Sequence, residues 1–326
     1  ADCEGVRIVN LSLFTSILSI TIRAGTSLLY ATIGEIYTER AGILNLGVEG
    51  MMMVGAVSAF AVAYHTDSLV LAVIVALLAG ALLASVHAFL SISLRANQVV
   101  SGLTLTLFGT GLASFLGQRL GPGGTRLVGL VGPSLGRFPI PLLSDLPIVG
   151  SALFNQDLLS YGVYAIVPLA WWYLYKTRPG LYMRSVGENP QTADAMGIRV
   201  GAVRYLYTAV GGALAGLGGA HLSLAYTKGW TENITGGRGW IAVALVIFAM
   251  WDPLRAVIGA ALFGGINAVQ FRMQAAGTTI PAALLNMLPY IATIVVLVVI
   301  TWWETLRKRI GAPGALGLPY AREEKG

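Results

Sequence analysis

Residues 69–94 read LVLAVIVALLAGALLASVHAFLSISL and contain no Asp, Glu, Lys or Arg. About 20 consecutive apolar residues suffice for an α-helix to cross the hydrocarbon core of a bilayer. Similar runs recur along the chain, which has 56% hydrophobic and 11% charged residues, whereas soluble domains average about 25% charged residues. The sequence therefore predicts an all-α, polytopic bundle of transmembrane helices that forms a single domain over residues 1–326.

Nine apolar segments are predicted to span the membrane. They are Leu11–Ile33, Gly42–Ala63, Leu69–Leu94, Val99–Leu116, Leu158–Tyr175, Tyr205–Leu224, Trp240–Met250, Leu254–Met273 and Ile280–Trp302. Trp240–Met250 would be only about 16 Å long as a helix, so it needs neighbouring residues to cross or belongs to a broken helix. Gly42–Leu94 and Gly236–Met273 share a Gly-rich start, an apolar stretch and an Asp-containing break, a pattern typical of inverted repeats with discontinuous helices.

The Lys and Arg residues fall mostly on one side of this topology, which includes residues 176–204 and the C-terminal tail. The positive-inside rule makes that side the cytoplasm, with the N-terminus outside and the C-terminus inside. The same rule explains the net charge of +6 better than nucleic-acid binding does. Residues 119–157 form an extracytoplasmic loop in which we expect short structured pieces. That loop is either a simple connector or a landing surface for an external partner.

A polar island at Lys176–Arg204, KTRPGLYMRSVGENPQTADAMGIRVGAVR, interrupts the apolar runs. Within it, Asn189 can cap a helix, Pro190 suits the first helical position, and Gly197 can end the helix in a left-handed conformation. A short capped helix on a cytoplasmic loop is suited to docking a partner protein. The island therefore predicts a membrane protein driven by a cytoplasmic subunit.

A second polar segment, Ala41–Gly50, enters an apolar span with Asn45, Gly47 and Glu49. A carboxylate in lipid is costly and is expected to face the protein interior or a water-filled path. Glu49 is therefore either part of a substrate pathway or gate, or a structural ion pair whose glycines only pack. Arg23 lies within the first predicted span at a similar depth, and we expect it to be coupled to Glu49.

Further amide and hydroxyl side chains lie in or near the predicted spans. Asn97, Gln98 and Ser101 either line the inner end of the path or sit at the membrane interface. The amides of Asn267, Gln270 and Asn286 can serve either helix–helix hydrogen bonds or substrate contacts.

No catalytic arrangement or metal-ligand spacing is apparent in the sequence. The P-loop pattern G-x-x-x-x-G-K-[ST] is also missing, so any ATP hydrolysis would occur on another chain. Cys3 is the only cysteine, which excludes an internal disulfide, and no role for it follows from the sequence.

Four motifs resemble one family over nearly the whole chain, from about Leu11 to Arg309. They are TERAGILNLGVEGMMMVGA (Thr38–Ala56), NQVVSGLTLTL (Asn97–Leu107), VGENPQTADAMGI (Val186–Ile198) and GGRGWIAVALVIFAMWDP (Gly236–Pro253). Together they look like the permease subunits of bacterial ABC importers in the branched-chain amino acid, ribose and nucleoside group. The nucleoside or simple-sugar branch matches best. Ribose-type permeases usually begin with a further N-terminal span, which we do not expect in this chain, so the predicted count is about nine spans, with a range of eight to ten.

The resemblance implies a role for particular residues. The helix Asn189–Met196 is similar to the coupling helix that docks into the ATPase, with Gly187, Glu188, Asn189, Pro190, Ala193, Asp194 and Gly197 as coupling residues. The Asn45–Gly50 segment matches the family signature near the translocation path. The expected substrate pathway comprises Arg23, Asn45, Gly47, Glu49, Asn97, Gln98, Ser101, Gly237 and Arg238.

The resemblance also implies partners and a location in a bacterial plasma (inner) membrane. The partners are an ATPase subunit that carries ATP and Mg, a second related permease in a heterodimer, and an extracytoplasmic binding protein or lipoprotein. The permease itself binds membrane lipid and no cofactor, and it catalyses no bond change. Nucleoside is the first substrate expected, followed by a small sugar or an amino acid. The alternatives are an ion-coupled secondary transporter and, last, a membrane scaffold.

Overall fold

The computed structural model describes residues 2–146, 149–307 and 311–322, without the side chains of residues 2–13 and of several positions late in the chain, among them Asn286. The longer helices are α1 (Asp2–Arg40), α2 (Val48–Thr66), α3 (Leu69–Ala88), α4 (Gln98–Arg119), α6 (Leu158–Lys176), α9 (Val200–His221), α11 (Pro253–Ala275) and α12 (Ala282–Arg307). The shorter ones are α5 (Val149–Leu153), α7 (Arg178–Glu188), α8 (Pro190–Ala195) and α10 (Arg238–Phe248).

Irregular and minor elements extend or connect these helices. A π-helical turn at Phe89–Ser93 continues α3, and another at Leu222–Tyr226 continues α9. The loop after α4 contains a 3-10 turn at Pro122–Gly124 and a two-stranded antiparallel pair of β1 (Phe138–Pro139) and β2 (Asn155–Gln156). These are the short structured pieces expected for the loop at residues 119–157.

The polytopic all-α bundle predicted from the sequence is confirmed. Within the described residues, 7 helices are long and apolar enough to cross a membrane. The shorter α10 and an apolar stretch of α12, Ala283–Val296, account for the other two predicted segments. Because α10 has only 11 residues, it is too short to cross the hydrocarbon core by itself.

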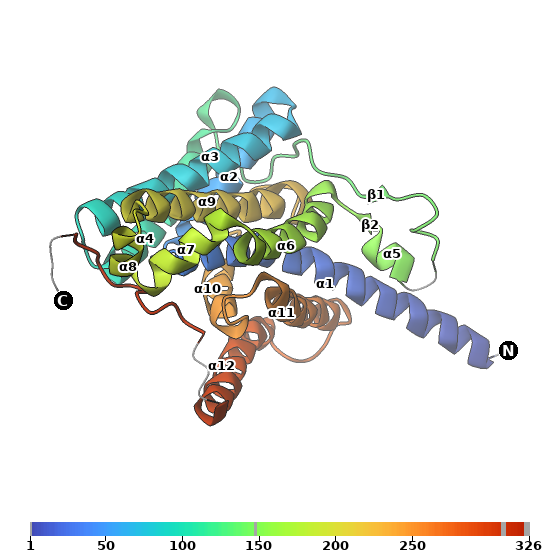
Figure 1. The fold of residues 1–326 in the computed structure, drawn as a ribbon. Coiled ribbons are helices and arrows are strands. Elements are labelled where there is room, and N and C mark those ends of the chain that lie inside the picture. Colours follow the sequence, from blue (N-terminus) through green and yellow to red (C-terminus); the bar gives the residue numbers. More distant parts are fainter. Residues whose placement is uncertain (1, 147–148, 308–310, 323–326) are drawn as a thin grey trace.

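Helix α9 occupies the centre of the bundle and packs against α1, α2 and α3 (Figure 1). Its glycines allow this close approach: a Cβ on Gly212 would collide with Gly80 and Ala84 of α3. Similarly, a Cβ on Gly216 would collide with the backbone of Ala76. In a bilayer, apolar side chains gain little free energy by moving from lipid to a contact between helices. Close backbone packing is therefore a main source of helix association there.

Three predicted boundaries are wrong. The span expected to start at Gly42 begins as a helix only at Val48, because residues 41–47 form a buried loop between α1 and α2. The span expected to start at Tyr205 begins at Val200, so α9 includes the last residues of the polar island. In addition, α1 continues past the expected end at Ile33 to Arg40.

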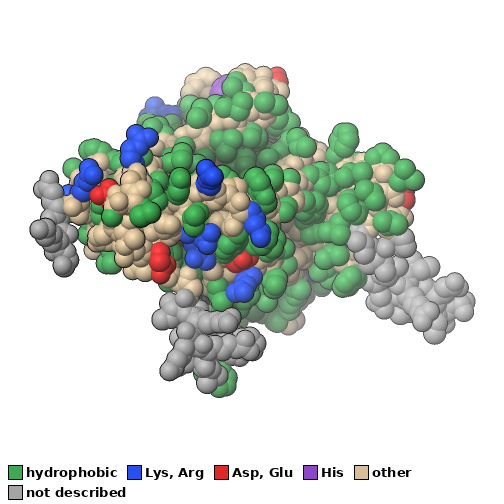
Figure 2. Space-filling view, in the orientation of Figure 1, with side chains coloured by type: hydrophobic (Ala, Val, Ile, Leu, Met, Phe, Trp, Pro, Cys, Tyr) green, Lys and Arg blue, Asp and Glu red, His purple; other side chains and the backbone are tan. Residues whose placement is uncertain are grey.

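The C-terminal strap, residues 311–322, runs back across α7 and α8 after α12 (Figure 1). Ala315 N–H donates to Gly187 O at 2.9 Å, and Gly317 N–H donates to Gly42 O at 3.3 Å. Figure 2 shows Lys and Arg side chains gathered around the end of the molecule where α7 and α8 lie, whereas much of the remaining visible surface is hydrophobic.

Candidate functional site

The buried loop at residues 41–47 is held in an irregular shape by side chains from three helices. Leu44 N–H donates to Gln98 Oε1 of α4 at 2.7 Å, and His87 Nε2 of α3 donates to Leu44 O at 3.1 Å. Asn45 N–H donates to Glu35 Oε1 of α1 at 3.0 Å. Because non-helical backbone inside a membrane must find partners within the protein, this conformation depends on all three neighbours.

The second half of the loop, which leads into α2, is also held by hydrogen bonds between side chains and backbone. Thr106 Oγ1 of α4 donates to Leu46 O at 2.8 Å, and Gly47 N–H donates to Asn45 Oδ1 at 2.9 Å. Asn45 is fully buried. Asn45 and Gly47, both predicted to belong to the substrate pathway, therefore shape the start of α2.

Glu49 lies in the first turn of α2 and caps the beginning of α10. Its Oε1 accepts hydrogen bonds from Thr235 Oγ1 at 2.5 Å and Gly237 N at 2.9 Å, and its Oε2 accepts from Gly239 N at 2.6 Å. A helix N-terminus has unpaired N–H groups and partial positive charge, so it stabilises a carboxylate. Glu49 thus joins α2 to the short helix α10, and the Gly-rich starts of the two proposed repeat units are in contact.

The expected pairing of Arg23 with Glu49 is wrong. Arg23 Nε lies 4.0 Å from Asp157 Oδ2, and its Nη2 donates to Ala225 O at 2.7 Å. Among the residues that the structure describes, three donors at the start of α10 bond to Glu49 instead. The sequence indicated similar depth for the two side chains, and depth alone could not identify their partners.

Arg23 and Arg238, both assigned to the pathway, meet at one aromatic ring. The Arg23 guanidinium carbon lies 5.9 Å from the centre of the Tyr226 ring, and that of Arg238 lies 4.8 Å from it. A guanidinium within about 6 Å of a ring centre is attracted to the face of the ring. Tyr226, at the end of the π-helical turn after α9, is a site residue that sequence reasoning missed.

Asp157 forms a second polar cluster that the sequence did not predict. Its Oδ1 caps α6 by accepting from Ser160 N at 3.0 Å, and its Oδ2 accepts from Ser160 Oγ at 2.7 Å and lies 3.6 Å from His221 Nε2. Burial opposes ionisation of Asp157, but the contacts with His221 and Ser160 outweigh it and hold the pKa of this carboxyl well below its usual range. All three residues are buried and the Ser160 hydroxyl donates to the carboxylate, so the cluster is structural and does not form a hydrolase triad.

The polar residues at the start of α4 have different surroundings. Asn97 is exposed and caps α4 by accepting from Val100 N at 3.1 Å. Gln98 and Ser101 are buried. Ser101 Oγ lies 3.0 Å from His87 Nδ1, so both buried residues support the loop at 41–47.

Two buried carboxylates on α1 were also missed. Glu35 and Glu39 are one helical turn apart, and Glu39 Oε2 accepts from Trp251 Nε1 at 2.5 Å. They were overlooked because the first span was expected to end at Ile33. The i, i+4 spacing of two acidic residues beside an apolar run was the available signal.

The predicted coupling segment, residues 187–197, has the expected local structure. Asn189 Oδ1 accepts from Thr192 N at 2.9 Å, Pro190 is the first residue of α8, and Gly197 has φ +82°. Ala193 lies on the buried face of α8. The exposed residues of this segment include Gln191, Thr192, Ala195, Met196 and Gly197.

Three of the predicted coupling residues hold internal contacts. Gly187 is buried, and a Cβ there would collide with Arg40 O. Glu188 Oε2 accepts from Gly314 N at 3.4 Å, and Asp194 Oδ2 lies 3.1 Å from Arg322 Nε. Gly187 is therefore a packing residue, and we expect its replacement with Ala to disturb the fold as well as any docking.

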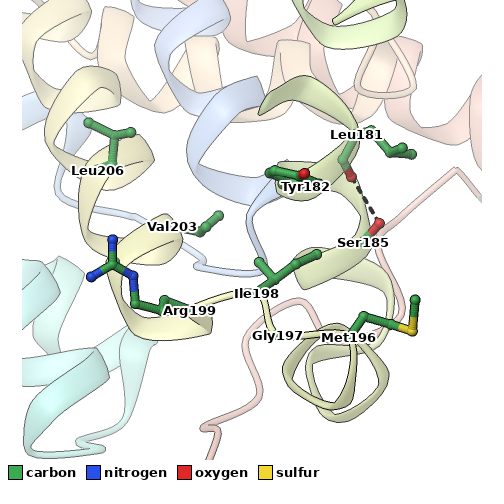
Figure 3. A pocket seen from close by; sticks show the side chains of 10 residues that line it. Leu181, Tyr182, Ser185, Met196, Gly197, Ile198, Arg199, Val203 and Leu206 are labelled. Carbon is green, nitrogen blue, oxygen red and sulfur yellow. Dashed lines mark hydrogen bonds between the residues drawn. The ribbon is translucent and has the colours of Figure 1, made fainter. Parts of the chain in front are cut away.

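A surface groove of about 650 Å³ lies beside α8, between α7 and the start of α9. Figure 3 shows its lining, in which Tyr182 and Ser185 of α7 lie near Ile198 and Val203, with Arg199 and Met196 at the margins. Met196 is 78% exposed. The polar island thus presents a short helix next to a mainly apolar groove.

Comparison with known proteins assigns the family. A family model described as the permease component of the branched-chain amino acid transport system matches residues 16–311. A putative glucose ABC transporter permease of Haloferax volcanii is 43% identical over 96% of this chain and 99% of its own length. A nucleoside ABC transporter permease of Lactococcus lactis is 37% identical over 92% of this chain and 94% of its length. A guanosine ABC transporter permease of Bacillus subtilis is 32% identical over 95% of this chain and 98% of its length.

Among solved structures there is no match. The family model and the relatives cover almost the whole chain, and the helices in the described residues are those of a multi-pass membrane protein. The chain therefore belongs to the permease-component family of branched-chain amino acid transport systems and is a membrane-spanning, non-enzymatic permease subunit of an ABC transporter.

Proposed function

We propose that this permease moves a nucleoside or a small sugar into the cytoplasm by alternating access, driven by ATP hydrolysis on a separate ATPase subunit. The observation that carries the proposal is the contact of Glu49 with the start of α10. It completes a path of contacts from α8, through α7 and the buried loop at residues 41–47, to the short helix α10. The substrate class is taken from relatives named as glucose, nucleoside and guanosine permeases.

A continuous set of contacts could transmit a push on α8. Gly187 at the end of α7 packs directly against the Gly42 backbone, and the C-terminal strap bonds to both residues. Gly42 begins the buried loop that leads to Glu49, whose carboxylate holds α10. In this mechanism the ATPase displaces α8, the loop shifts, and α10 moves together with α2, to which Glu49 holds it. Such a two-state displacement of packed elements is the usual form of alternating access.

The proposed assembly contains an ATPase on the exposed face of α8, a second related permease and an extracytoplasmic substrate-binding protein or lipoprotein. Basic side chains around α7 and α8 support placing this side, with the C-terminus, in the cytoplasm. The protein would lie in the plasma membrane with its N-terminus outside. ATP and Mg would bind only to the ATPase, and Gln191, Thr192, Ala195 and Met196 would provide the docking contacts.

The test is uptake of radiolabelled guanosine and of glucose by proteoliposomes that contain the complete complex and its binding protein. We expect uptake of at least one solute to require ATP and to stop when the P-loop lysine of the ATPase is replaced. An ionophore that collapses ion gradients serves as the control and is expected to have no effect. Uptake by this chain alone, abolished by the ionophore, would instead establish the ion-coupled transporter. That alternative has lost one support, because Arg23 and Glu49 are not paired.

A further inference from the structure

A polar cavity of about 330 Å³ lies between the start of α10 and helices α11 and α12. Its lining includes Thr235, Arg238, Asn267, Gln270 and Tyr290. This volume is near the lower end of the range of about 300–1,000 Å³ for small-molecule sites. The cavity therefore has room for a ligand of roughly monosaccharide or nucleoside size.

The two amides are unusual for their position in a transmembrane helix. Asn267 is 9% and Gln270 is 6% exposed, and they are three residues apart on α11, so they lie on the same face of the helix. Asn267 Nδ2 donates to Phe263 O at 2.9 Å. This bond fixes the amide and makes its Oδ1 the atom that can accept from a solute. Polar side chains at this depth, beside a cavity, are typical of a transport pathway.

The charges around the cavity are balanced within the protein. Glu49 bonds to Gly237 N and Gly239 N, the residues on either side of Arg238, so a carboxylate accompanies the guanidinium at the same helix start. Arg238 also lies 4.8 Å from the Tyr226 ring centre. This balance disfavours a strongly charged ligand. Amides, which donate and accept, complement the hydroxyl groups of a neutral solute.

Tyr290 adds an aromatic surface to the cavity. Its hydroxyl donates to Gly236 O at 2.7 Å, which ties α12 to the residue preceding the cap of α10. A ring fixed in this way can pack against the apolar face of a sugar ring while the amides bind hydroxyls at its edge. An apolar platform beside polar groups is a suitable combination for a furanose or pyranose.

We infer that this cavity is a solute-contact site of the permease, in which Asn267 and Gln270 bind the hydroxyl groups of a neutral sugar ring. The inference rests on the proposed function, since it names the part of the transported solute that this chain recognises. A nucleoside and glucose share such a ring. Because Glu49 holds the start of α10, movement of that helix would open or close the site from one side.

The test measures binding directly, in the absence of the binding protein. The permease is purified with its partner subunits into nanodiscs, and saturation-transfer NMR is recorded with millimolar guanosine or glucose. We expect transfer to the sugar-ring protons of at least one probe. We also expect at least a tenfold loss of apparent affinity in Asn267→Leu and in Gln270→Leu. Val269→Leu is the matched control, because Val269 is 45% exposed on another face of the same helix.

A second pair of probes tests the chemistry of recognition. An analogue of the bound probe that lacks one ring hydroxyl is expected to bind more weakly than the parent to the wild type, and this difference should shrink in the two amide variants. Guanosine monophosphate is expected to bind no better than guanosine. Unchanged binding in both amide variants, equal losses for parent and analogue, or no binding of either neutral probe to the wild type would overturn the inference. Failure of ATP-driven uptake alone would contradict the proposed function and leave the binding result standing.

Discussion

Replacing Glu49 with Gln should loosen the start of α10 without unfolding the bundle. The carboxylate accepts three hydrogen bonds from Thr235, Gly237 and Gly239. The amide can keep those at Oε1, but its NH₂ group then faces Gly239 N–H, and two donors cannot bond. The lost charge-assisted bond contributes about 1.5–3 kcal/mol, and the interaction of the charge with the helix end contributes about 1 kcal/mol more. We therefore expect α10 to lose about 3 kcal/mol of local stabilisation.

Hydrogen exchange measured by mass spectrometry on the nanodisc complex can detect this change. Because a tenfold change in an equilibrium corresponds to about 1.4 kcal/mol, exchange at the start of α10 should accelerate about 100-fold if it occurs by local opening. A peptide from α3 should be unchanged. Glu232→Gln is the matched control, since Glu232 is an exposed carboxylate that accepts a hydrogen bond from the exposed Gln118 Nε2 and lies outside the cap of α10.

The same substitution should also reduce transport. We expect ATP-driven uptake in Glu49→Gln to fall at least tenfold with normal expression and assembly, because α10 no longer follows α2. Exchange at the start of α10 within twofold of the wild-type rate would refute the capping argument. Normal uptake combined with accelerated exchange would instead show that Glu49 stabilises the start of α10 but is not needed for transport.

Three other changes test separate parts of the molecule. Asn189→Ala removes the cap of α8, should destabilise that helix by about 1 kcal/mol, and should reduce co-purification of the ATPase in a pull-down. Gly216→Leu places a side chain against the Ala76 backbone and should abolish the monodisperse peak in size-exclusion chromatography, whereas Gly111→Leu, with nothing within 4 Å of its Cβ, should behave as wild type. Asp157 has a depressed pKa in the folded protein, so its stabilisation is present above the ordinary carboxyl pKa of about 3.9 and is lost as pH falls below it. The melting temperature of Asp157→Asn should accordingly fall less steeply on acidification than that of the wild type.

Local features of the chain were predictable because they depend on neighbours in sequence. Apolar length identified the spans, and the Asn189, Pro190 and Gly197 pattern identified α8, since capping and the φ preferences of Pro and Gly act within one helical turn. The shortness of Trp240–Met250 correctly indicated a short helix, which the structure places at Arg238–Phe248. The helix at Arg178–Glu188 was missed because it lies within a polar stretch that has no spanning length.

Local sequence patterns could not identify the partners of the buried polar groups. Glu49 and Gly239 are separated by 190 positions, and Arg23 reaches Ala225 across 202. Similarly, Gly187 looked like a docking residue but packs against Arg40 once the chain is folded. Hydropathy indicates which segments lie within the membrane. Whether two side chains in those segments touch also depends on which face of each helix they occupy and on which helices pack together.

The sequence by itself determined that this chain is a membrane bundle with a short capped helix on a polar loop, because both follow from transfer free energy and local backbone preferences. Only the tertiary structure decided that Glu49 caps α10, that Arg23 pairs with Asp157, and that the strap joins α7 to the loop at residues 41–47. Buried polar groups must find partners. Which partner each one finds depends on how distant helices pack, and that packing is a property of the whole chain.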